Sequence, residues 1–240
     1  MLLSQVEIKV NDHLYIKDPV SSDLGKRIVK GGISMVCEYG FEDFTFKKLA
    51  TAIQSTEASI YRYFESKHKF LLYLSSWYWS WMDYQVAIGT ANMADAYKRL
   101  LKAIDIITQR HERTEEVFTH IPEDQLQMIV MSESSKSYHT RAVDEENQVG
   151  IYSSYSQLVD RLSDMILAVN PEYKYPHMIV STLIEGVHNQ RFFAEHLPRL
   201  TDAQQGSDAI TTFFKDMVVK TIRPSKITTT NQFYEKLDNI

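Results

Sequence analysis

Cysteine, positive charge and long apolar runs are all scarce in this chain. Cys37 is the only cysteine among 240 residues, which excludes a disulfide framework within the chain. No window approaches the roughly 18 uncharged apolar residues of a membrane span, and the first ten residues lack the apolar core of a signal peptide. We therefore expect a cytoplasmic protein with no membrane contact. Lys and Arg number 26 against 31 Asp and Glu, so the net charge of −5 by itself argues against a nucleic-acid-binding protein.

The common signatures of catalysis and metal binding are missing as well. The eight glycines form no GxSxG elbow, no P-loop and no GxGxxG, and the eight histidines form no HExxH pair. His188 and His196 are about two helical turns apart and could share a face, but a core or surface histidine is the simpler interpretation for each. We expect no enzymatic activity, no bound metal and no cofactor.

Apolar and aromatic residues are plentiful. They make up 44% and 12% of the chain, which provides for a sizeable core and excludes global disorder. Cys37 follows the apolar face of the first expected helix and is interpreted as a small buried side chain. The charge is also unevenly distributed: residues 21–70 carry a net +2, which leaves −7 for the remainder. This modest asymmetry suits a DNA-facing module on an acidic body.

Helical spacing of apolar residues continues through most of the chain after residue 20, without alternating strands, and predicts an all-α fold. Four parts are expected: an N-terminal extension over 1–20, a compact helical domain over 21–68, a larger helical domain over 69–223 and a polar tail over 224–240. Alternation over residues 6–16 predicts a short hairpin, with a disordered arm as the alternative. The expected helices after Gly89 cover about 92–111, 123–133, 141–169, 176–196 and 207–222, with a loop over 132–139.

The segment TFKKLATAIQSTEASIYRYFESK at 45–67 is the most informative part of the chain. Apolar residues at 46, 49, 50 and 53 form one helical face, and Thr45 can cap that helix. Gln54-Ser55-Thr56 interrupts the pattern, after which Ile60 and Phe64 share the face of a second short helix. Two short helices joined by a tight turn predict a helix-turn-helix, whose second helix can enter the major groove of DNA.

With these residues, the chain resembles the TetR family of bacterial transcriptional regulators over about residues 24–75. The resemblance includes Tyr39-Gly40-Phe41, Phe44-Thr45, Leu49-Ala50, the run at 60–64 and Ser66-Lys67 at matching spacing. Two departures from the family pattern stand out. Gln54 replaces the usual turn glycine and needs a left-handed backbone or a different turn. Gly31-Gly32 replaces two alanines, at about 1 kcal/mol each in helix propensity.

The resemblance implies which residues meet DNA. It assigns phosphate contacts to Thr45, Tyr61, Tyr63 and Lys67, and base contacts to Lys47, Glu57, Ala58, Ser59 and Arg62. The residue types suit these tasks, because hydroxyls and a lysine bind phosphates while an arginine can grip guanine. Alternatives remain: the two tyrosines as partly buried aromatics, Glu57 interacting only with its own helix, Lys47 as a solvated side chain, and Arg62 on a phosphate.

The resemblance also implies a homodimer, built from the helices at 176–196 and 207–222, with Gly186 permitting close approach at the seam. The larger domain would bind a small-molecule effector, and the aromatic and Met content suggests an apolar or aromatic one. The candidate pocket residues are Tyr97, Ile104, Tyr152, Tyr155, His188 and Phe192.

The expected function is therefore a homodimeric DNA-binding transcription regulator, in the form of a repressor released from its double-stranded operator by a ligand. The alternative is a helical small-molecule-binding protein or enzyme that retains a DNA-binding-like module without using it. A regulator that acts through a protein partner is a third interpretation.

Overall fold

The structure, a computed structural model, describes residues 8–109, 121–204 and 208–223. Within these ranges the chain forms ten α-helices and three short 3-10 helices, and no strand. The all-α prediction is confirmed. The tail over 224–240 lies outside the described residues, and so do two of the eight histidines, His111 and His120.

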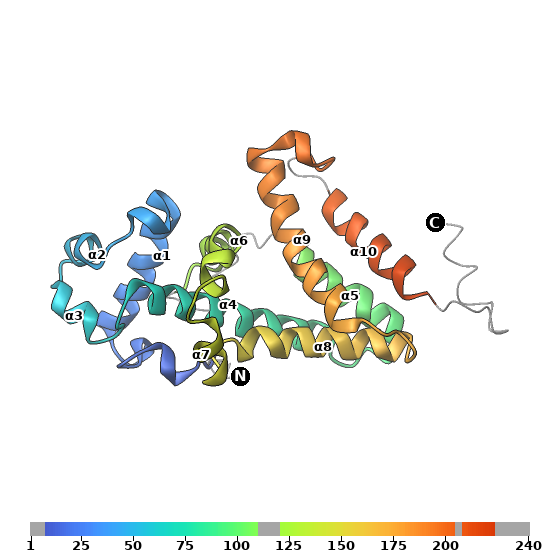
Figure 1. Ribbon diagram of the computed structural model, residues 1–240, viewed down its shortest axis with the longest axis horizontal. Helices are drawn as coiled ribbons and strands as arrows, with labels where there is room; N and C mark the ends of the chain where they lie inside the picture. Colours follow the sequence, from blue (N-terminus) through green and yellow to red (C-terminus); the bar gives the residue numbers. More distant parts are fainter. Residues whose placement is uncertain (1–7, 110–120, 205–207, 224–240) are drawn as a thin grey trace, which may run out of the picture.

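Three helices form a compact unit at one end of the molecule, on the left of Figure 1. They are α1 (Asp23–Asp43), α2 (Phe46–Ala52) and α3 (Glu57–Tyr61). Each begins at a hydroxyl side chain that accepts a backbone N–H: Ser22, Thr45 and Thr56, respectively. Aromatic rings fill the space between them, with Phe44 stacked on Phe70 at 5.4 Å between centroids. The unit is therefore a packed three-helix domain that contains the predicted helix-turn-helix.

Both departures from the family pattern have structural explanations. Gln54 has φ 53°, the left-handed conformation that was one of the two predicted solutions. A Cβ atom on Gly32 would lie 2.3 Å from Cζ of Phe70, and one on Gly31 would lie 2.7 Å from Cγ2 of Ile53. The two glycines thus allow α1 to approach its neighbours closely, which offsets their low helix propensity.

The N-terminal segment does not form the predicted hairpin. Its described part, from residue 8, contains 3-10 turns at Asp12–Leu14 and Pro19–Ser21 instead of strands. The side chains of Asn11 and Asp18 accept backbone N–H groups two residues on, which closes local turns in place of a ladder. The segment is anchored by Leu14, which is 1% exposed, and by a bond from the Ile16 amide to the Tyr63 carbonyl.

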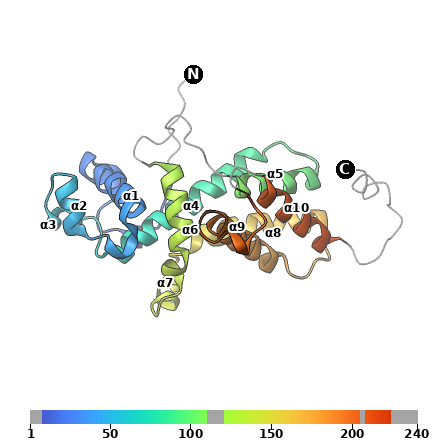
Figure 2. The ribbon, with the colours of Figure 1, turned by 90° about the horizontal axis from the view of Figure 1, so that it is seen from above.

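The body is organised around α4 (Lys67–Gly89), which begins beside the three-helix domain of α1 to α3 and runs through the rest of the molecule. It packs against α5 (Ala96–Thr108), α6 (Glu123–Tyr138) and α8 (Ser153–Val169). Figure 2 shows α6 and the short α7 (Val143–Gln148) crossing the long axis beside α4. Thirteen α4 residues are buried, which explains its aromatic character on more than one face.

Two predicted boundaries in the body are wrong. The expected loop over 132–139 is helical as far as Tyr138, because Ser75 and Ser137 form a buried hydrogen bond of 3.1 Å that holds the polar turn against α4. The single helix expected over 141–169 is two helices, α7 and α8. Gly150 separates them at φ 76°, and Asn11 donates to its carbonyl oxygen at 2.9 Å.

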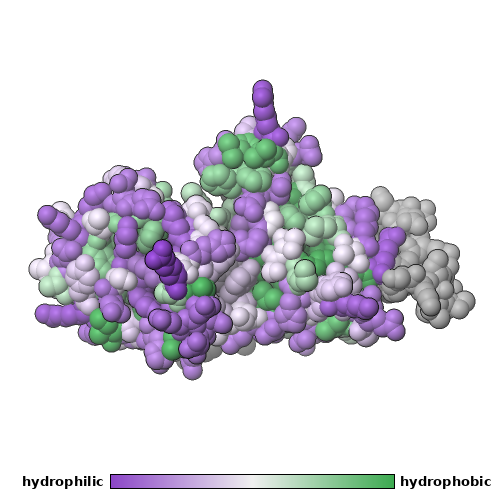
Figure 3. Space-filling model, viewed as in Figure 1, coloured by the Kyte–Doolittle hydropathy of each residue, from purple (hydrophilic) through white to green (hydrophobic). Residues whose placement is uncertain are grey.

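The last two helices, α9 (Pro176–His196) and α10 (Ala209–Ile222), agree well with their predicted ranges. Gly186 does not lie open for a partner helix, because Phe214 of the same chain fills its place, 2.7 Å from where a Cβ would be. The end of α9 projects from the body and carries an apolar surface, at the top of Figure 3. No helix in the described ranges has the length and apolar character needed to span a membrane.

Candidate nucleic-acid interface and effector region

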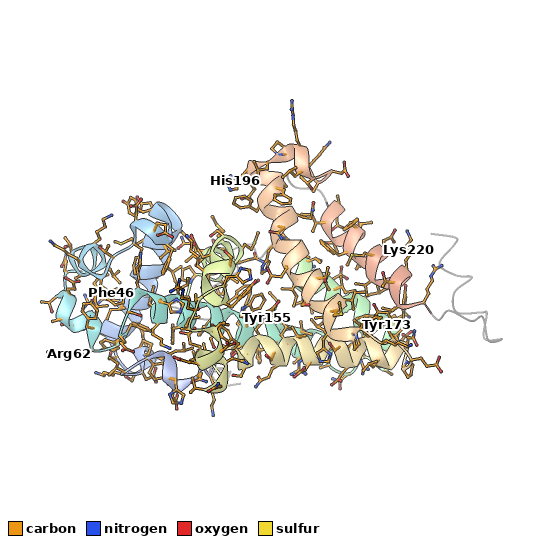
Figure 4. All side chains as sticks on the ribbon, viewed as in Figure 1. Phe46, Arg62, Tyr155, Tyr173, His196 and Lys220 are labelled. Carbon is orange, nitrogen blue, oxygen red and sulfur yellow. The ribbon has the colours of Figure 1, made fainter. Side chains whose placement is uncertain are left out.

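The helix-turn-helix presents one face to the interior and the other to solvent. Phe46 and Ile60 are 4% and 0% exposed and fix α2 and α3 to the domain core. Arg62, at the C-terminal end of α3, is exposed and points away from the molecule at its outer left edge, whereas Phe46 points inward (Figure 4). The outer face of α2 and α3 is therefore the end surface of the whole protein, with nothing of the described chain covering it.

Thr45 and Tyr61 lie where a phosphate could reach them. Thr45 is exposed, and its Oγ1 accepts the amide of Lys48 at 3.2 Å, so its own proton remains available. Tyr61 is 46% exposed, and its ring meets that of Phe46 edge to face at 5.1 Å. The contact orients the phenol ring. Both residues are therefore accessible to solvent.

Tyr63 departs from its predicted role as a phosphate contact. The residue is 3% exposed, and its hydroxyl shares a 2.8 Å hydrogen bond with that of Ser22. This bond lowers the pKa of the phenol, and Lys17 lies over the ring at 5.2 Å from its centroid. Tyr63 therefore joins the N-terminal segment to the domain, which corresponds to the alternative of a buried aromatic.

Lys67 has a structural role in addition to the predicted one. Its ammonium donates to the carbonyl oxygens of Phe41 and Glu42, both at 3.3 Å, and lies 4.9 Å from the centroid of the Phe41 ring. It therefore caps the C-terminal end of α1. An ammonium has three N–H groups, so one remains for a phosphate.

The five predicted base contacts belong to α2, to α3 and to the residue that ends α3. Lys47, Ala58 and Arg62 are exposed, whereas Glu57 and Ser59 are half-buried. The hydroxyl of Ser59 forms a 2.8 Å hydrogen bond with that of Thr56, at the first turn of α3.

Sequence reasoning missed Arg27. Its guanidinium donates to the carbonyl of Ile53 at 3.1 Å and holds the turn between α2 and α3. No signal in the local pattern indicates this contact, because it joins residues 26 positions apart.

Residues 28–74 match the family model described as bacterial regulatory proteins of the tetR family. The chain carries the N-terminal domain of the TetR family. No curated protein matches it by sequence at a significant level. This TetR domain is thus assigned from the family model, together with the helix-turn-helix observed in the same residues.

Solved structures share the fold of most of the chain. PfmR from Thermus thermophilus, a TetR-family transcriptional regulator, has a TM-score of 0.54 at 11% identity, over 82% of this chain and 100% of its own. AibR in complex with isovaleryl coenzyme A and operator DNA has a TM-score of 0.53 at 13% identity. The match covers 83% of this chain and 99% of AibR. The superantigen PfiT has a TM-score of 0.55 at 16% identity, and the match covers 85% of this chain and 97% of PfiT. At such identities these likenesses show that the body has a TetR-like helical fold, and no more.

The six predicted effector residues of the TetR-like body do not come together in any of three cavities lined by the described residues. Ile104 is fully buried core, Tyr97 is half-buried on α5, and Phe192 is 38% exposed on α9. Only Tyr152 and Tyr155 line a common cavity between α4, α6 and α8, and its volume is about 20 Å³. That space holds a water molecule at most. A ligand there would have to displace side chains.

An aromatic stack borders this small cavity. The Trp79 ring is stacked on Tyr155 at 4.4 Å and on His188 at 5.6 Å. Glu185 accepts hydrogen bonds from the hydroxyls of Tyr138 and Tyr155 at 2.8 and 3.4 Å. Burial, followed by the charge of Glu185, raises the pKa of Tyr155. Burial also lowers the pKa of His188 to about 4. Trp79 and Glu185, on α4 and α9, were not predicted.

Two larger clefts open on the surface. One, of about 830 Å³, lies between the end of α4, α5 and α8, and its wall includes an ion pair between Arg161 and Asp83. The other, of about 670 Å³, lies between α1, α6 and α9 and contains Phe192. Both fall within the size range of small-molecule sites. Among the described residues, no group of three His, Cys, Asp or Glu is placed to hold a metal ion.

Proposed function

We propose that this protein is a homodimeric transcription regulator, a repressor that a small molecule releases from its DNA operator. The main support is the outer face of α2 and α3. It combines the TetR-family match with exposed Arg62, Thr45 and Tyr61 at the end of the molecule. Arg62 and Lys47 supply positive charge there, although the chain as a whole is acidic.

Dimerisation through α9 and α10 is supported by apolar side chains left on their surface. Met178 and Phe213 are 67% and 58% exposed, which is unfavourable in water for side chains of this size. Leu197 and Leu200 extend this surface past the end of α9. A second copy covering both helices would remove these residues from water and fix the separation of the two recognition helices, as a two-fold DNA site requires.

Release by a ligand requires that the ligand prefer one separation of the recognition helices over the other. Contacts between the TetR domain and the body provide a route for such coupling. Glu146 of α7, 6% exposed, lies 3.2 and 3.4 Å from His68 and Lys69 at the start of α4. Its other oxygen accepts the hydroxyl of Tyr152 at 2.8 Å. An effector that moved Tyr152 would therefore act, through Glu146, on the start of α4, next to the proposed DNA-binding domain.

Fluorescence anisotropy against the DNA upstream of the protein's own gene tests the proposal. Tyr61→Phe should weaken binding to all sequences by about tenfold or more, since it removes a hydrogen bond to a charged phosphate. Tyr63→Phe is the matched variant and should leave DNA affinity unchanged, because that hydroxyl bonds Ser22. Equal losses in both variants, or none in either, would contradict the proposed orientation of α3.

A second pair of variants tests base recognition. Arg62→Ala should cost about 1–3 kcal/mol of binding free energy and relax preference at one base position, whereas a contact to phosphate alone would leave preference unchanged. Arg141→Ala, which changes an exposed arginine between α6 and α7, is its control. If no DNA fragment is bound at low salt, the alternative of an unused DNA-binding-like module replaces the proposal.

A further inference from the structure

The cleft between α1, α6 and α9 lies where the TetR domain meets the body. Its volume is about 670 Å³, and its walls come from both parts of the molecule. The lining residues that matter here are Cys37, Asp124, Met128, Met131, Arg191 and Phe192. None except Phe192 was a candidate from the sequence, because the cleft forms only where three helices far apart in the chain come together.

An unsatisfied carboxylate oxygen distinguishes this cleft. Oδ1 of Asp124 is buried and has no hydrogen-bond partner among the described residues. A buried acceptor without a partner is unfavourable, and an unfilled ion or donor position is a common reason for one. The neighbouring Cys37 does not satisfy it, since its Sγ donates to the carbonyl of Gln125 at 3.2 Å.

Negative charge exceeds positive charge around the cleft. Among the described residues that line it, Asp124, Glu133 and Glu195 are the carboxylates and Arg191 is the one guanidinium. Glu133 forms an ion pair of 2.8 Å with Lys136, just outside. Counting that lysine, three carboxylates face two cations among these described residues. An anionic ligand would therefore meet repulsion.

The remaining wall is apolar and adaptable. Met128 is 50% exposed and Met131 half-buried, and both contribute flexible, polarizable thioethers. Phe192, 38% exposed, presents an aromatic ring, a group that attracts cations as well as apolar surfaces. The wall thus suits a molecule with an apolar body.

We propose that this cleft binds a lipophilic organic cation, with Asp124 as its charge partner and Met128, Met131 and Phe192 around its apolar part. Binding there bears directly on the contacts between α1 and α6. These contacts include the ion pair of Lys136 with Glu42 at 2.8 Å and the bond from Ser34 to Gln125 at 3.3 Å. The consequence for DNA affinity rests on the proposed function, whereas binding of the cation does not.

Isothermal titration of the full chain, without DNA, tests the site. Tetraphenylphosphonium is the probe, and tetraphenylborate, of similar shape and opposite charge, is its control. We expect the cation to bind and the anion to bind at least tenfold more weakly. Asp124→Asn should lower cation affinity by about tenfold or more, because it removes a charged hydrogen-bond acceptor. Asp164→Asn, in the other large cleft, should change nothing.

Two further variants keep the result interpretable. Met128→Lys adds a positive charge at a half-exposed position where folding is not at risk, and should also lower cation affinity at least tenfold. Glu185→Gln removes the carboxylate of the aromatic stack in the body. If Glu185→Gln abolishes cation binding while Asp124→Asn and Met128→Lys do not, the proposal is overturned. Equal affinity for phosphonium and borate would overturn it as well.

The regulatory part has a separate readout. Tetraphenylphosphonium should lower the DNA affinity of the wild-type protein at least tenfold but that of Asp124→Asn much less. If the cation binds with unchanged DNA affinity, regulation through this cleft is refuted and the binding site stands. If the wild-type protein binds no DNA, the proposed function fails, and the titration still decides the site.

Discussion

Protonation of His188 should destabilise the protein as the pH falls. The residue is 6% exposed, stacked on Trp79, and its Nδ1 has no hydrogen-bond partner among the described residues. Burial, with a smaller contribution from the charge of Arg191, lowers the pKa of His188 to about 4. In the unfolded chain a histidine has a pKa of about 6.5. Protons therefore bind the unfolded chain more tightly, so the stability contributed by neutral His188 is complete above pH ~6.5 and is lost between that value and pH ~4.

The size of the effect follows from the two pKa values. The free energy of unfolding attributable to this group should fall by about 0.8 kcal/mol at pH 6 and by about 2 kcal/mol at pH 5, relative to pH 8. Against the usual 5–15 kcal/mol or so of a whole protein, a change of that size is readily measured.

Urea unfolding of the wild type and of His188→Gln, at fixed protein concentration, measures this pH dependence of the free energy of unfolding. Many carboxylates also titrate in this range, so the informative quantity is the difference between the two proteins at each pH. His188→Gln should be less stable at pH 8 and should lose less stability on acidification. His177→Gln removes an exposed histidine and should follow the wild type at every pH. A wild-type minus His188→Gln difference that stays constant from pH 8 to pH 5 would refute the reasoning.

Three further predictions concern helix packing, a backbone turn and the proposed dimer. Gly32→Ala should destabilise the protein by about 1–3 kcal/mol in urea unfolding, because its Cβ would overlap Phe70, despite a gain in helix propensity. Lys30→Ala on the same helix should stay within about 0.5 kcal/mol of the wild type. Gln54→Gly should stabilise by about 1 kcal/mol, since Gln54 has φ 53°, and unchanged stability would count against the left-handed turn. Phe213→Glu should convert the proposed dimer to a monomer in sedimentation experiments, and a persisting dimer would exclude α10 from the interface.

Much of the helical architecture could be read from the chain, because helical periodicity is a local property. The ranges of α9 and α10 followed from the spacing of their apolar residues, and the cap at Thr45 followed from the side chain beside that pattern. Errors arose where distant residues intervene. The polar end of α6 is helical because Ser137 bonds Ser75, and the segment around Asn11 turns because its side chain reaches the loop at Gly150.

The amino-acid sequence determined the class of the fold, the presence of the TetR domain and the residue types on its outer face. Each of these depends on spacing within a few turns of helix. Only the tertiary structure decided which of those residues face solvent. It placed Tyr61 outward and Tyr63 against Ser22, two positions apart on the same segment. It also decided that the predicted pocket residues do not converge and that the cleft beside Asp124 exists, because cavities arise from the packing of helices far apart in the chain.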